Sequence, residues 1–362
     1  MTTQVLIFLA GLLALVAGAD LLVRSASRLA LSFGISPLVV GLTIVAMGTS
    51  APEIAVSVGA ALDGRTDIAI GNVVGSNIFN VLFILGLSAL ITPLVVNAQI
   101  IRQEVPIMIG ASLLLLAFAL DGQLGFWECG FLLVLLLAYT VFLVRQSRRE
   151  SQATRDEYEH QVVKASRWDA HWAVQLLLIG VGLALLVFGS QWLVAAATAF
   201  ARSMGVSDLV IGLTIVAAGT SLPEVATSVM AALRKERDIA IGNVIGSNTF
   251  NILGCLGLTG LLATDGLPIA AGLLNFDIWV MLAVAFACLP VFLSGRQIAR
   301  WEGGVFMGYY LAYTAYVVLN AQQHAALPAF GTAMLSFVLP LTVVTLVVAM
   351  LRPAPATSAR GM

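Results

Sequence analysis

The stretch Gly41 to Asn80, GLTIVAMGTSAPEIAVSVGAALDGRTDIAIGNVVGSNIFN, decides how this chain is organised, because it occurs twice. The second copy, Gly212 to Asn251, reads GLTIVAAGTSLPEVATSVMAALRKERDIAIGNVIGSNTFN and matches the first at 29 of 40 positions, without a gap, at an offset of 171 residues. Internal repetition sets the architecture before any local feature does. Two copies this far apart are not a solenoid. They predict two halves that are built alike and meet at one shared place.

The composition identifies the class of protein. Of the 362 residues, 60% are hydrophobic and only 10% are charged, whereas a soluble domain carries about 25% charged residues. Apolar runs of about 20 residues, long enough to cross a bilayer as a helix, recur along the chain. We therefore expect an all-α polytopic membrane protein and no aqueous enzyme domain. The net charge of −1 gives no indication of nucleic-acid binding, and the N-terminus is typical of a first membrane helix rather than a cleaved signal peptide.

Eleven membrane helices are predicted. They cover residues 4–23, 38–61, 68–91, 104–121, 126–144, 172–197, 209–232, 239–262, 275–294, 302–320 and 329–351. Five helices form a first repeat, residues 1–144, with its motif at 41–80. Five more form a second repeat, residues 172–322, with its motif at 212–251. A charged linker, residues 145–171, joins the repeats, and an extra helix at 329–351 follows them.

The basic residues test this helix count. With the N-terminus outside, 16 of the 18 Lys and Arg residues fall inside and only Arg65 and Arg202 outside, in agreement with the positive-inside rule. The linker and the C-terminus are then cytoplasmic, and the protein lies in a cell (inner) membrane. The two copies cross the membrane in opposite directions. Such inverted-topology repeats are typical of secondary transporters that bind substrate near the midplane.

Glu53 and Glu224 occupy matching positions deep in apolar helices that contain no Lys or Arg. A charged residue at the centre of a membrane helix costs about 2.5–3.5 kcal/mol on insertion scales, and two carboxylates close together also repel each other. Protons or bound cations must therefore neutralise them. The alternative is a permanently protonated structural pair.

A proline stands directly before each of these glutamates. The segments Ser50–Glu53 and Ser221–Glu224 fit the capping-box pattern of a helix start. Pro52 and Pro223 lack an N–H group and interrupt a helix in the middle of a membrane-length run. Irregular backbone at this depth is tolerated where it lines a cavity. We therefore expect two broken helices with free carbonyl oxygens beside the carboxylates.

Hydroxyl and amide side chains recur at helical spacing around both glutamates. The set is Thr49, Ser50, Glu53, Ser57, Asn72, Ser76 and Asn80, and in the second copy Thr220, Ser221, Glu224, Ser228, Asn243, Ser247 and Asn251. These hard oxygen ligands suit Na⁺, Ca²⁺ or Mg²⁺ rather than a soft metal. A cage spread over four helices favours calcium and sodium, and competition for one set of ligands is the simplest basis for exchange.

Other residues are expected to be structural. The GxxxG segments Gly71–Gly75 and Gly242–Gly246 allow close helix packing. Asp20 is expected to pair with Arg24 near the membrane surface. The remaining expectations are interfacial positions for Glu104 and Asp277, and burial as small apolar residues for Cys129, Cys255 and Cys288.

At these motifs the chain resembles the calcium/cation antiporter superfamily, which includes the Na⁺/Ca²⁺ exchangers. GTSAPE…GNVVGSNIFN and GTSLPE…GNVIGSNTFN are similar to its alpha-1 and alpha-2 repeats. The resemblance covers about residues 1–320 and is strongest to the short prokaryotic members. It implies two inverted five-helix halves around a central site, with helices one and six sliding to alternate access.

The resemblance also implies a ligand set. Ca²⁺ would be held by the carboxylates of Glu53 and Glu224 and by the main-chain carbonyls of Thr49 and Thr220. The implied sodium ligands are the side chains of Ser50, Ser76, Asn80, Ser221, Ser247 and Asn251, with carbonyl oxygens near Ala46 and Ala217. No cofactor is implied other than the transported ions.

Two features depart from the family pattern. Asn251 stands where many members, notably the potassium-dependent branch, carry Asp, so K⁺ co-transport is not expected. The extra helix at 329–351 would serve a dimer contact or orient the C-terminus. The predicted function is Na⁺/Ca²⁺ antiport in the lipid bilayer, by a protein that could form a homo-oligomer. The alternatives are proton coupling on the same fold, a channel, or an intramembrane hydrolase, for which no nucleophile–base pair is present.

Overall fold

The computed structural model describes residues 2–33, 35–147, 171–204, 215, 217–263 and 266–351. Eight of its helices are long and apolar enough to cross a membrane, and a helix pair bent by 42° makes a ninth span. These nine spans correspond to nine of the predicted helices. The predicted helix at 209–232 lies partly outside the described residues. The predicted helix at 302–320 is present as α17 (Arg300–Ala321), but its four tyrosines make it less apolar than the others.

The first half of the chain follows the predicted order of elements. Its helices are α1 (Thr2–Phe33), α2 (Pro37–Val40), η1 (Gly41–Val45), α3 (Ala46–Thr49), α4 (Ala51–Leu62), α5 (Thr66–Phe79), η2 (Asn80–Leu85), α6 (Gly86–Ile91), η3 (Ile100–Glu104), α7 (Val105–Ala119) and α8 (Phe126–Ser147), where η marks a π-helix. The strands β1 (Leu94–Val95) and β2 (Gln123–Leu124) lie in its loops.

The second half repeats this order as far as it is described. Its helices are α10 (Trp172–Ser203), α12 (Ala217–Gly219), α13 (Leu222–Leu233), α14 (Arg237–Phe250), η5 (Asn251–Leu256), α15 (Gly257–Leu262), η6 (Leu273–Asp277), α16 (Ile278–Leu293) and α17. Its strands are β3 (Leu267–Pro268) and β4 (Gln297–Ile298), and the extra segment consists of α18 (Leu327–Ala333), η7 (Met334–Val338) and α19 (Leu339–Leu351). Residues 148–170 of the predicted linker lie outside the described part of the chain.

Most predicted helix ends are right to within a few residues, with two exceptions. α1 continues to Phe33 rather than residue 23, and α10 to Ser203 rather than residue 197. Ala26, Leu29 and Ala30 of the extension are buried in one cluster with residues of the second half. Tertiary packing therefore extends α1 beyond the strongly apolar run that predicted it. The four short strands were also not predicted, because two residues carry no recognisable alternation.

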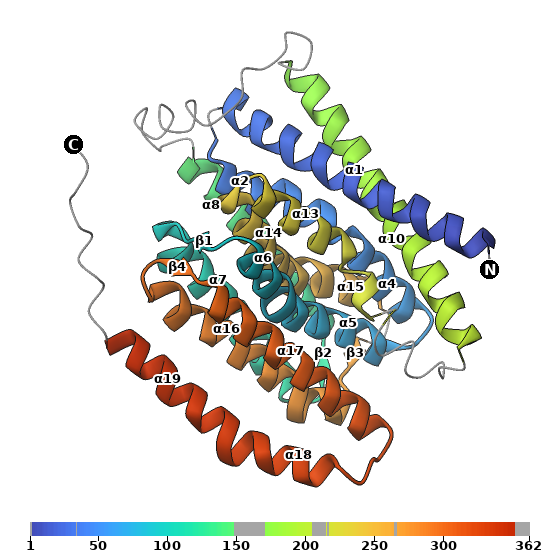
Figure 1. Ribbon diagram of the computed structural model, residues 1–362, viewed down its shortest axis with the longest axis vertical. Helices are drawn as coiled ribbons and strands as arrows, with labels where there is room; N and C mark the ends of the chain where they lie inside the picture. Colours follow the sequence, from blue (N-terminus) through green and yellow to red (C-terminus); the bar gives the residue numbers. More distant parts are fainter. Residues whose placement is uncertain are drawn as a thin grey trace.

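The two halves contact each other reciprocally at the offset of the sequence repeat. α1 crosses α10 with Gly18 against the carbonyl oxygen of Gly182, and Gly189 against that of Gly11. Likewise β1 pairs with β4 and β2 pairs with β3, each pair joining a strand of one half to a strand of the other. Reciprocal contact of equivalent residues is what a two-fold relation between like units produces. Figure 1 shows α1 and α10 side by side along one edge of the molecule.

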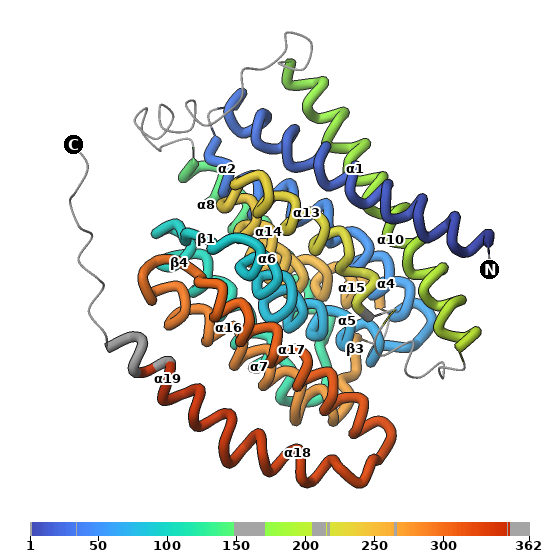
Figure 2. Tube along the Cα trace, in the orientation of Figure 1, coloured from blue at the N-terminus to red at the C-terminus, as the bar shows by residue number. Residues whose placement is uncertain are grey.

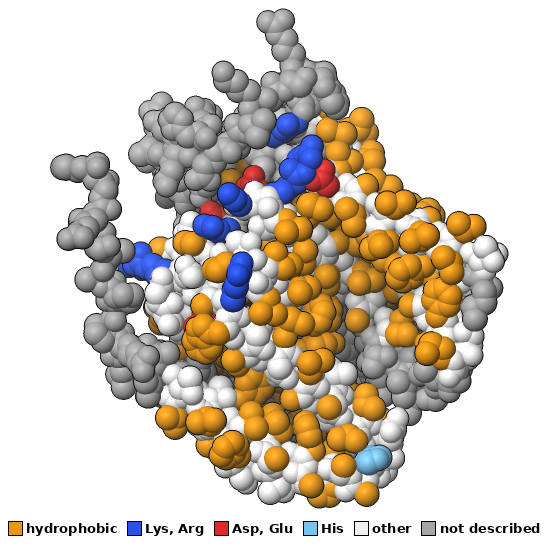
Figure 3. All heavy atoms as spheres, viewed as in Figure 1, with side chains coloured by type: hydrophobic (Ala, Val, Ile, Leu, Met, Phe, Trp, Pro, Cys, Tyr) orange, Lys and Arg blue, Asp and Glu red, His pale blue; other side chains and the backbone are white. Residues whose placement is uncertain are grey.

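The repeated motifs occupy the centre of the helix bundle. The span Arg237–Leu262 has 94% of its most apolar window buried, whereas the extra segment Leu327–Thr345 has none of its window buried. Figure 2 shows α14 near the middle of the bundle and the extra segment along the edge opposite α1. Figure 3 shows a largely hydrophobic surface with the basic side chains gathered at one end of the visible face. Such a surface suits a protein surrounded by lipid.

Close packing of α14 confirms the role predicted for one GxxxG segment. A Cβ atom added at Gly246 would lie 2.7 Å from the carbonyl oxygen of Leu42, and one added at Gly242 would lie 3.1 Å from that of Leu38. Only glycine allows η1 and α2 to approach α14 so closely. The chain that would face Gly71–Gly75 in the same way, around residues 209–213, lies outside the described residues.

Candidate cation site

Both predicted helix breaks are present, and each places a glutamate in the first turn of a new helix. α3 ends at Thr49, Ser50 forms a turn, and α4 begins at Ala51 with Glu53 in its first turn. The second copy repeats this with Ser221 before α13 and Glu224 in the first turn. The N–H groups of a first helical turn have no partners within the helix. A negatively charged side chain is electrostatically favoured there.

The two glutamates are held by serines of the opposite half. Ser221 Oγ donates a hydrogen bond to Glu53 Oε1 at 2.8 Å, and Ser50 Oγ donates to Glu224 Oε1 at 3.1 Å. Glu53 is 0% exposed and Glu224 is 1% exposed. The two carboxylates therefore face a common region at the interface between the halves.

These bonds correct one detail of the sequence interpretation. Ser50 and Ser221 are N-cap residues, as the capping-box pattern predicts, but neither side chain makes a capping hydrogen bond to its own helix. The hydroxyl groups are directed across the interface instead. The reason is tertiary: each hydroxyl donates to a buried carboxylate of the other half, and hydrogen bonds to an ionised group are stronger than neutral ones.

Among the described residues, eleven buried side-chain polar atoms have no hydrogen-bond partner, and five of these are oxygen atoms of predicted cation ligands. These five are Glu53 Oε2, Glu224 Oε2, Asn80 Oδ1, Asn251 Oδ1 and Ser247 Oγ. Unpartnered buried polar atoms are rare in native proteins, and each requires an explanation. Two carboxylate and three neutral oxygen atoms are a donor set that fits a hard cation such as Na⁺ or Ca²⁺.

Other predicted ligands have partners at the same interface. The Ser76 hydroxyl donates to Ser221 Oγ at 3.2 Å, because Ser221 gives its one proton to Glu53. The hydroxyl of Thr49 donates to Asn243 Oδ1 at 3.1 Å, and that of Thr220 to Asn72 Oδ1 at 3.5 Å. These bonds pin the helix breaks to the opposite half. The main-chain carbonyls of Thr49, Thr220, Ala46 and Ala217 stay predictions as ligands.

Four polar residues of the motifs support the helices rather than face the cluster of free oxygens. Asn72 Nδ2 donates to Ser57 Oγ at 3.0 Å and to the Glu53 carbonyl oxygen at 3.2 Å. Asn243 Nδ2 likewise donates to Ser228 Oγ at 2.9 Å. These bonds tie α4 to α5 and α13 to α14. Their helical spacing alone did not distinguish them from the ligands.

Two residues of the site were missed by the sequence interpretation. Asn77 and Asn248 are buried and hydrogen-bond to the predicted ligands Asn251 and Asn80. The available signal was the serine–asparagine pair, Ser76-Asn77 and Ser247-Asn248, present in both copies. A further local feature is that the π-helices η2 and η5 begin at Asn80 and Asn251. π-Helical segments are frequent at functional sites.

The remaining acidic residues lie apart from the site. Asp20 forms an ion pair with Arg24 at 3.1 Å, as predicted, and a second with Arg234. Glu104 lies four residues into the helix that begins at Ile100, and its interfacial position stays a prediction. Its carboxylate is 0% exposed and accepts hydrogen bonds from Tyr139 at 2.6 Å and from two glutamine side chains. Three neutral donors therefore compensate its burial. Asp277 is half-buried and accepts from Tyr313 at 2.8 Å.

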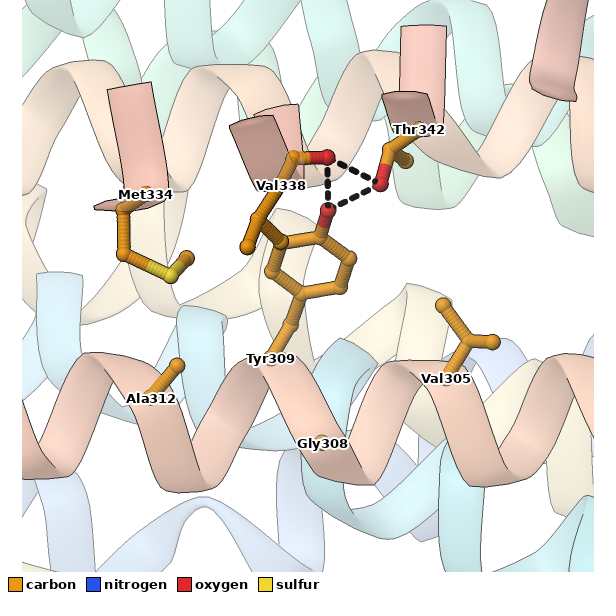
Figure 4. Close-up of a pocket in the computed structure, with 7 residues that line it drawn as sticks. All are labelled: Val305, Gly308, Tyr309, Ala312, Met334, Val338 and Thr342. Atoms are coloured by element: carbon orange, nitrogen blue, oxygen red, sulfur yellow. Dashed lines mark hydrogen bonds between the residues drawn. The ribbon is translucent and has the colours of Figure 1, made fainter. Parts of the chain in front are cut away.

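A cavity of about 260 Å³ lies outside the repeats, between α17 and the extra segment (Figure 4). Figure 4 shows the Tyr309 hydroxyl pointing across it towards Val338 and Thr342, to which it is hydrogen-bonded. The lining residues carry no charge. This cavity is therefore unsuited to hold a cation. The three cysteines are buried, as predicted.

Comparison with known proteins identifies the family. The family model described as sodium/calcium exchanger protein matches residues 3–145 and 174–319. This chain belongs to the sodium/calcium exchanger family. It is 36% identical over 343 residues to sodium/calcium exchanger MaX1 of Methanosarcina acetivorans, covering 86% of this chain and 97% of that one. It is also 37% identical over 310 residues to inner membrane protein YrbG of Escherichia coli, covering 85% and 95%.

The fold is that of a solved family member. The structure of the sodium-calcium exchanger NCX_Mj, soaked with Na⁺ and Ca²⁺, superposes with a TM-score of 0.74 at 31% sequence identity, covering 86% of this chain and 98% of that one. The exchanger family consists of multi-pass membrane transporters and not of enzymes. The resemblance stated from the two motifs is thereby confirmed, and the chain is a short member of prokaryotic type.

Proposed function

We propose that the protein is a secondary active antiporter that exchanges Na⁺ for Ca²⁺ by alternating access, without K⁺. The observation that carries the proposal is the pair of buried carboxylates, Glu53 and Glu224, each with one oxygen bonded to a serine of the other half and one oxygen without a partner. Two such carboxylates balance the charge of one Ca²⁺. They also balance two Na⁺ ions, which need the additional neutral oxygens.

The proposed ligands follow the predicted assignment. Ca²⁺ binds Glu53, Glu224 and the carbonyls of Thr49 and Thr220, while Na⁺ binds the serine and asparagine oxygens and carbonyls near Ala46 and Ala217. Ca²⁺ takes about 6–8 oxygens in flexible geometry, whereas Mg²⁺ gives up its water reluctantly. The neutral Asn251 adds no charge for a co-transported K⁺. Cation ligands drawn from both halves support exchange, because sliding of the first and sixth helices against the rest opens the site to one side at a time.

The membrane arrangement belongs to the same proposal. The two five-helix halves are inverted relative to each other, the N-terminus is outside, and the linker and C-terminus are cytoplasmic. Reciprocal contacts between the halves support the repeat, and the basic side chains gathered at one end of the visible face support the orientation. The extra segment α18–α19 has no buried residue in its membrane-length window, lies on the edge of the fold, and suits a contact with lipid or a second copy.

Transport into vesicles tests the function. Purified protein is reconstituted into liposomes loaded with Na⁺, diluted into Na⁺-free buffer, and supplied with external ⁴⁵Ca²⁺. We expect uptake that depends on the outward Na⁺ gradient and is indifferent to K⁺. Absence of Na⁺-driven uptake contradicts the sodium coupling, and uptake driven by a pH gradient in Na⁺-free buffer supports a proton-coupled antiporter of the same fold.

A further inference from the structure

Four asparagines form a hydrogen-bonded network where the two halves meet. Asn77 and Asn80 come from the first half, Asn248 and Asn251 from the second, and all four are at most 3% exposed. Asn77 Nδ2 donates to the main-chain oxygen of Asn248, and Asn248 Nδ2 donates to that of Asn77, both at 3.2 Å. Asn80 Nδ2 donates to Asn248 Oδ1 at 2.9 Å, and Asn251 Nδ2 donates to Asn77 Oδ1 at 3.1 Å.

The main-chain carbonyls determine the orientation of the whole network. The oxygen and nitrogen ends of an asparagine amide have nearly the same shape, so its hydrogen-bond partners decide which end points where. A carbonyl oxygen only accepts, so Asn77 and Asn248 must turn their nitrogen ends towards it. Sulfur atoms of Met281 and Met108 lie 3.7 and 3.6 Å from the same nitrogens, and a thioether also only accepts.

Asn77 and Asn248 in turn determine which way the amide groups of the predicted ligands point. Because Asn77 and Asn248 present their oxygen ends, Asn251 and Asn80 must donate to them with Nδ2. The opposite ends, Asn251 Oδ1 and Asn80 Oδ1, are buried and have no donor among the described residues. If either ligand amide were reversed, its N–H groups would face the cation and repel it.

We propose that Asn77 and Asn248 are positioning residues for cation binding, each of which orients the amide of a ligand on the opposite half of the protein. The proposal rests on the function proposed above, because it takes Asn80 and Asn251 as cation ligands. Asn77 acts on Asn251 and Asn248 acts on Asn80. Neither positioning residue touches the cation. Each half of the protein therefore completes the binding geometry of the other.

Double-mutant cycles on Ca²⁺ binding test this assignment in the purified full-length protein in detergent, with isothermal titration calorimetry as the readout. Asn77→Ala and Asn251→Ala are each expected to raise the Kd for Ca²⁺ about tenfold, or about 1.4 kcal/mol. The double variant is also expected to lie about tenfold above the wild type, because an absent amide cannot be misoriented. The pair Asn248→Ala and Asn80→Ala is expected to behave in the same way.

The matched control exchanges the partners. The side chains of Asn77 and Asn80 are not hydrogen-bonded to each other, although both donate to Asn248. Asn77→Ala with Asn80→Ala should therefore raise the Kd well beyond either single variant, towards a hundredfold. If Asn77 has a merely structural role, the increases in Kd should multiply in both double variants, the bonded pair with Asn251 and the exchanged pair with Asn80. Multiplicative effects in the bonded pairs, or equal coupling in bonded and exchanged pairs, overturn the proposal.

Two further measurements separate this proposal from failure to fold and from failure of the proposed function. The Kd does not depend on the fraction of protein that is folded, so partial unfolding of a variant does not imitate weaker binding. The cycle is also repeated with Asn77→Ser and Asn248→Ser, which leave smaller cavities than alanine. The cycles are also run with Na⁺. If the bonded pairs are coupled in cation binding but the wild type shows no Na⁺-driven Ca²⁺ uptake, the positioning role is supported and the transport function is refuted. Binding of neither cation overturns both.

Discussion

Replacement of Glu53 by Gln is the most direct test of the proposed site. The amide has the size of the carboxylate, and its oxygen can still accept the hydrogen bond that Ser221 donates at 2.8 Å. What disappears is the negative charge on a side chain that is 0% exposed. Removal of one charged partner from a buried ionic interaction costs about 3–5 kcal/mol. Since about 1.4 kcal/mol corresponds to a tenfold change, the Kd for Ca²⁺ should rise by roughly 100-fold to 3,000-fold.

The assay compares Ca²⁺ binding, transport and stability in the same preparation. We expect Glu53→Gln to abolish Na⁺-driven ⁴⁵Ca²⁺ uptake while the protein remains folded in detergent. In the presence of a chelator, the variant should be at least as stable as the wild type, because it removes repulsion between two buried carboxylates. Ca²⁺ at 100 times its Kd should stabilise the wild type by about 2.7 kcal/mol and should not stabilise the variant. Glu224→Gln should behave identically.

A matched control distinguishes the site from burial of charge in general. Glu104 is as buried as Glu53, but three neutral side chains donate to its carboxylate. Glu104→Gln should therefore keep exchange and the stabilisation by Ca²⁺. Near-normal transport by Glu53→Gln or Glu224→Gln would remove that carboxylate from the mechanism. Equal loss of transport in Glu104→Gln would show that loss of any buried carboxylate, wherever it lies, abolishes exchange.

Three further predictions concern selectivity, packing and pH. Asn251→Asp adds a third acidic side chain to the site and should change how Na⁺ and K⁺ compete with ⁴⁵Ca²⁺ uptake; unchanged competition counts against Asn251 as a ligand. Gly246→Ala places a Cβ atom 2.7 Å from the Leu42 carbonyl oxygen and should destabilise the protein by about 1–3 kcal/mol in thermal unfolding, whereas Gly59→Ala, with no described atom within 4 Å, should not. Burial raises the pKa of the Glu236 carboxyl, in the loop before α14, above its ordinary value. The folded state thus binds this proton more tightly, so stability should fall as the pH rises from the ordinary pKa through the raised one, and Glu236→Gln should flatten this slope; an unchanged slope contradicts it.

The sequence alone determined the class of protein and the repeat, and it predicted the place of the candidate site. Composition and apolar runs predicted a polytopic helical protein because a bilayer demands long apolar helices. The doubled motif predicted two like halves, and the prolines at 52 and 223 predicted the helix breaks that the structure contains. Glu53 and Glu224 could be identified because a buried acid without a basic partner in its own helix is costly, whatever the tertiary structure.

Only the tertiary structure decided which oxygen atoms are free and which are occupied. The hydroxyl of Ser50 bonds Glu224, 174 residues away, and not its own helix, so its local capping pattern was misleading in this detail. Helical spacing placed Asn72 and Asn80 on one face. In the structure, Asn72 ties α4 to α5, whereas Asn80 presents an unpartnered oxygen.

Asn77 and Asn248 show the same limit most clearly. Their importance depends on carbonyl groups of the other half, 171 residues away. The periodicity of one helix carries no information about the face that the opposite half presents to it. Hydrogen bonding is short-ranged and directional, so the orientation of an amide is settled only when the two halves are packed together.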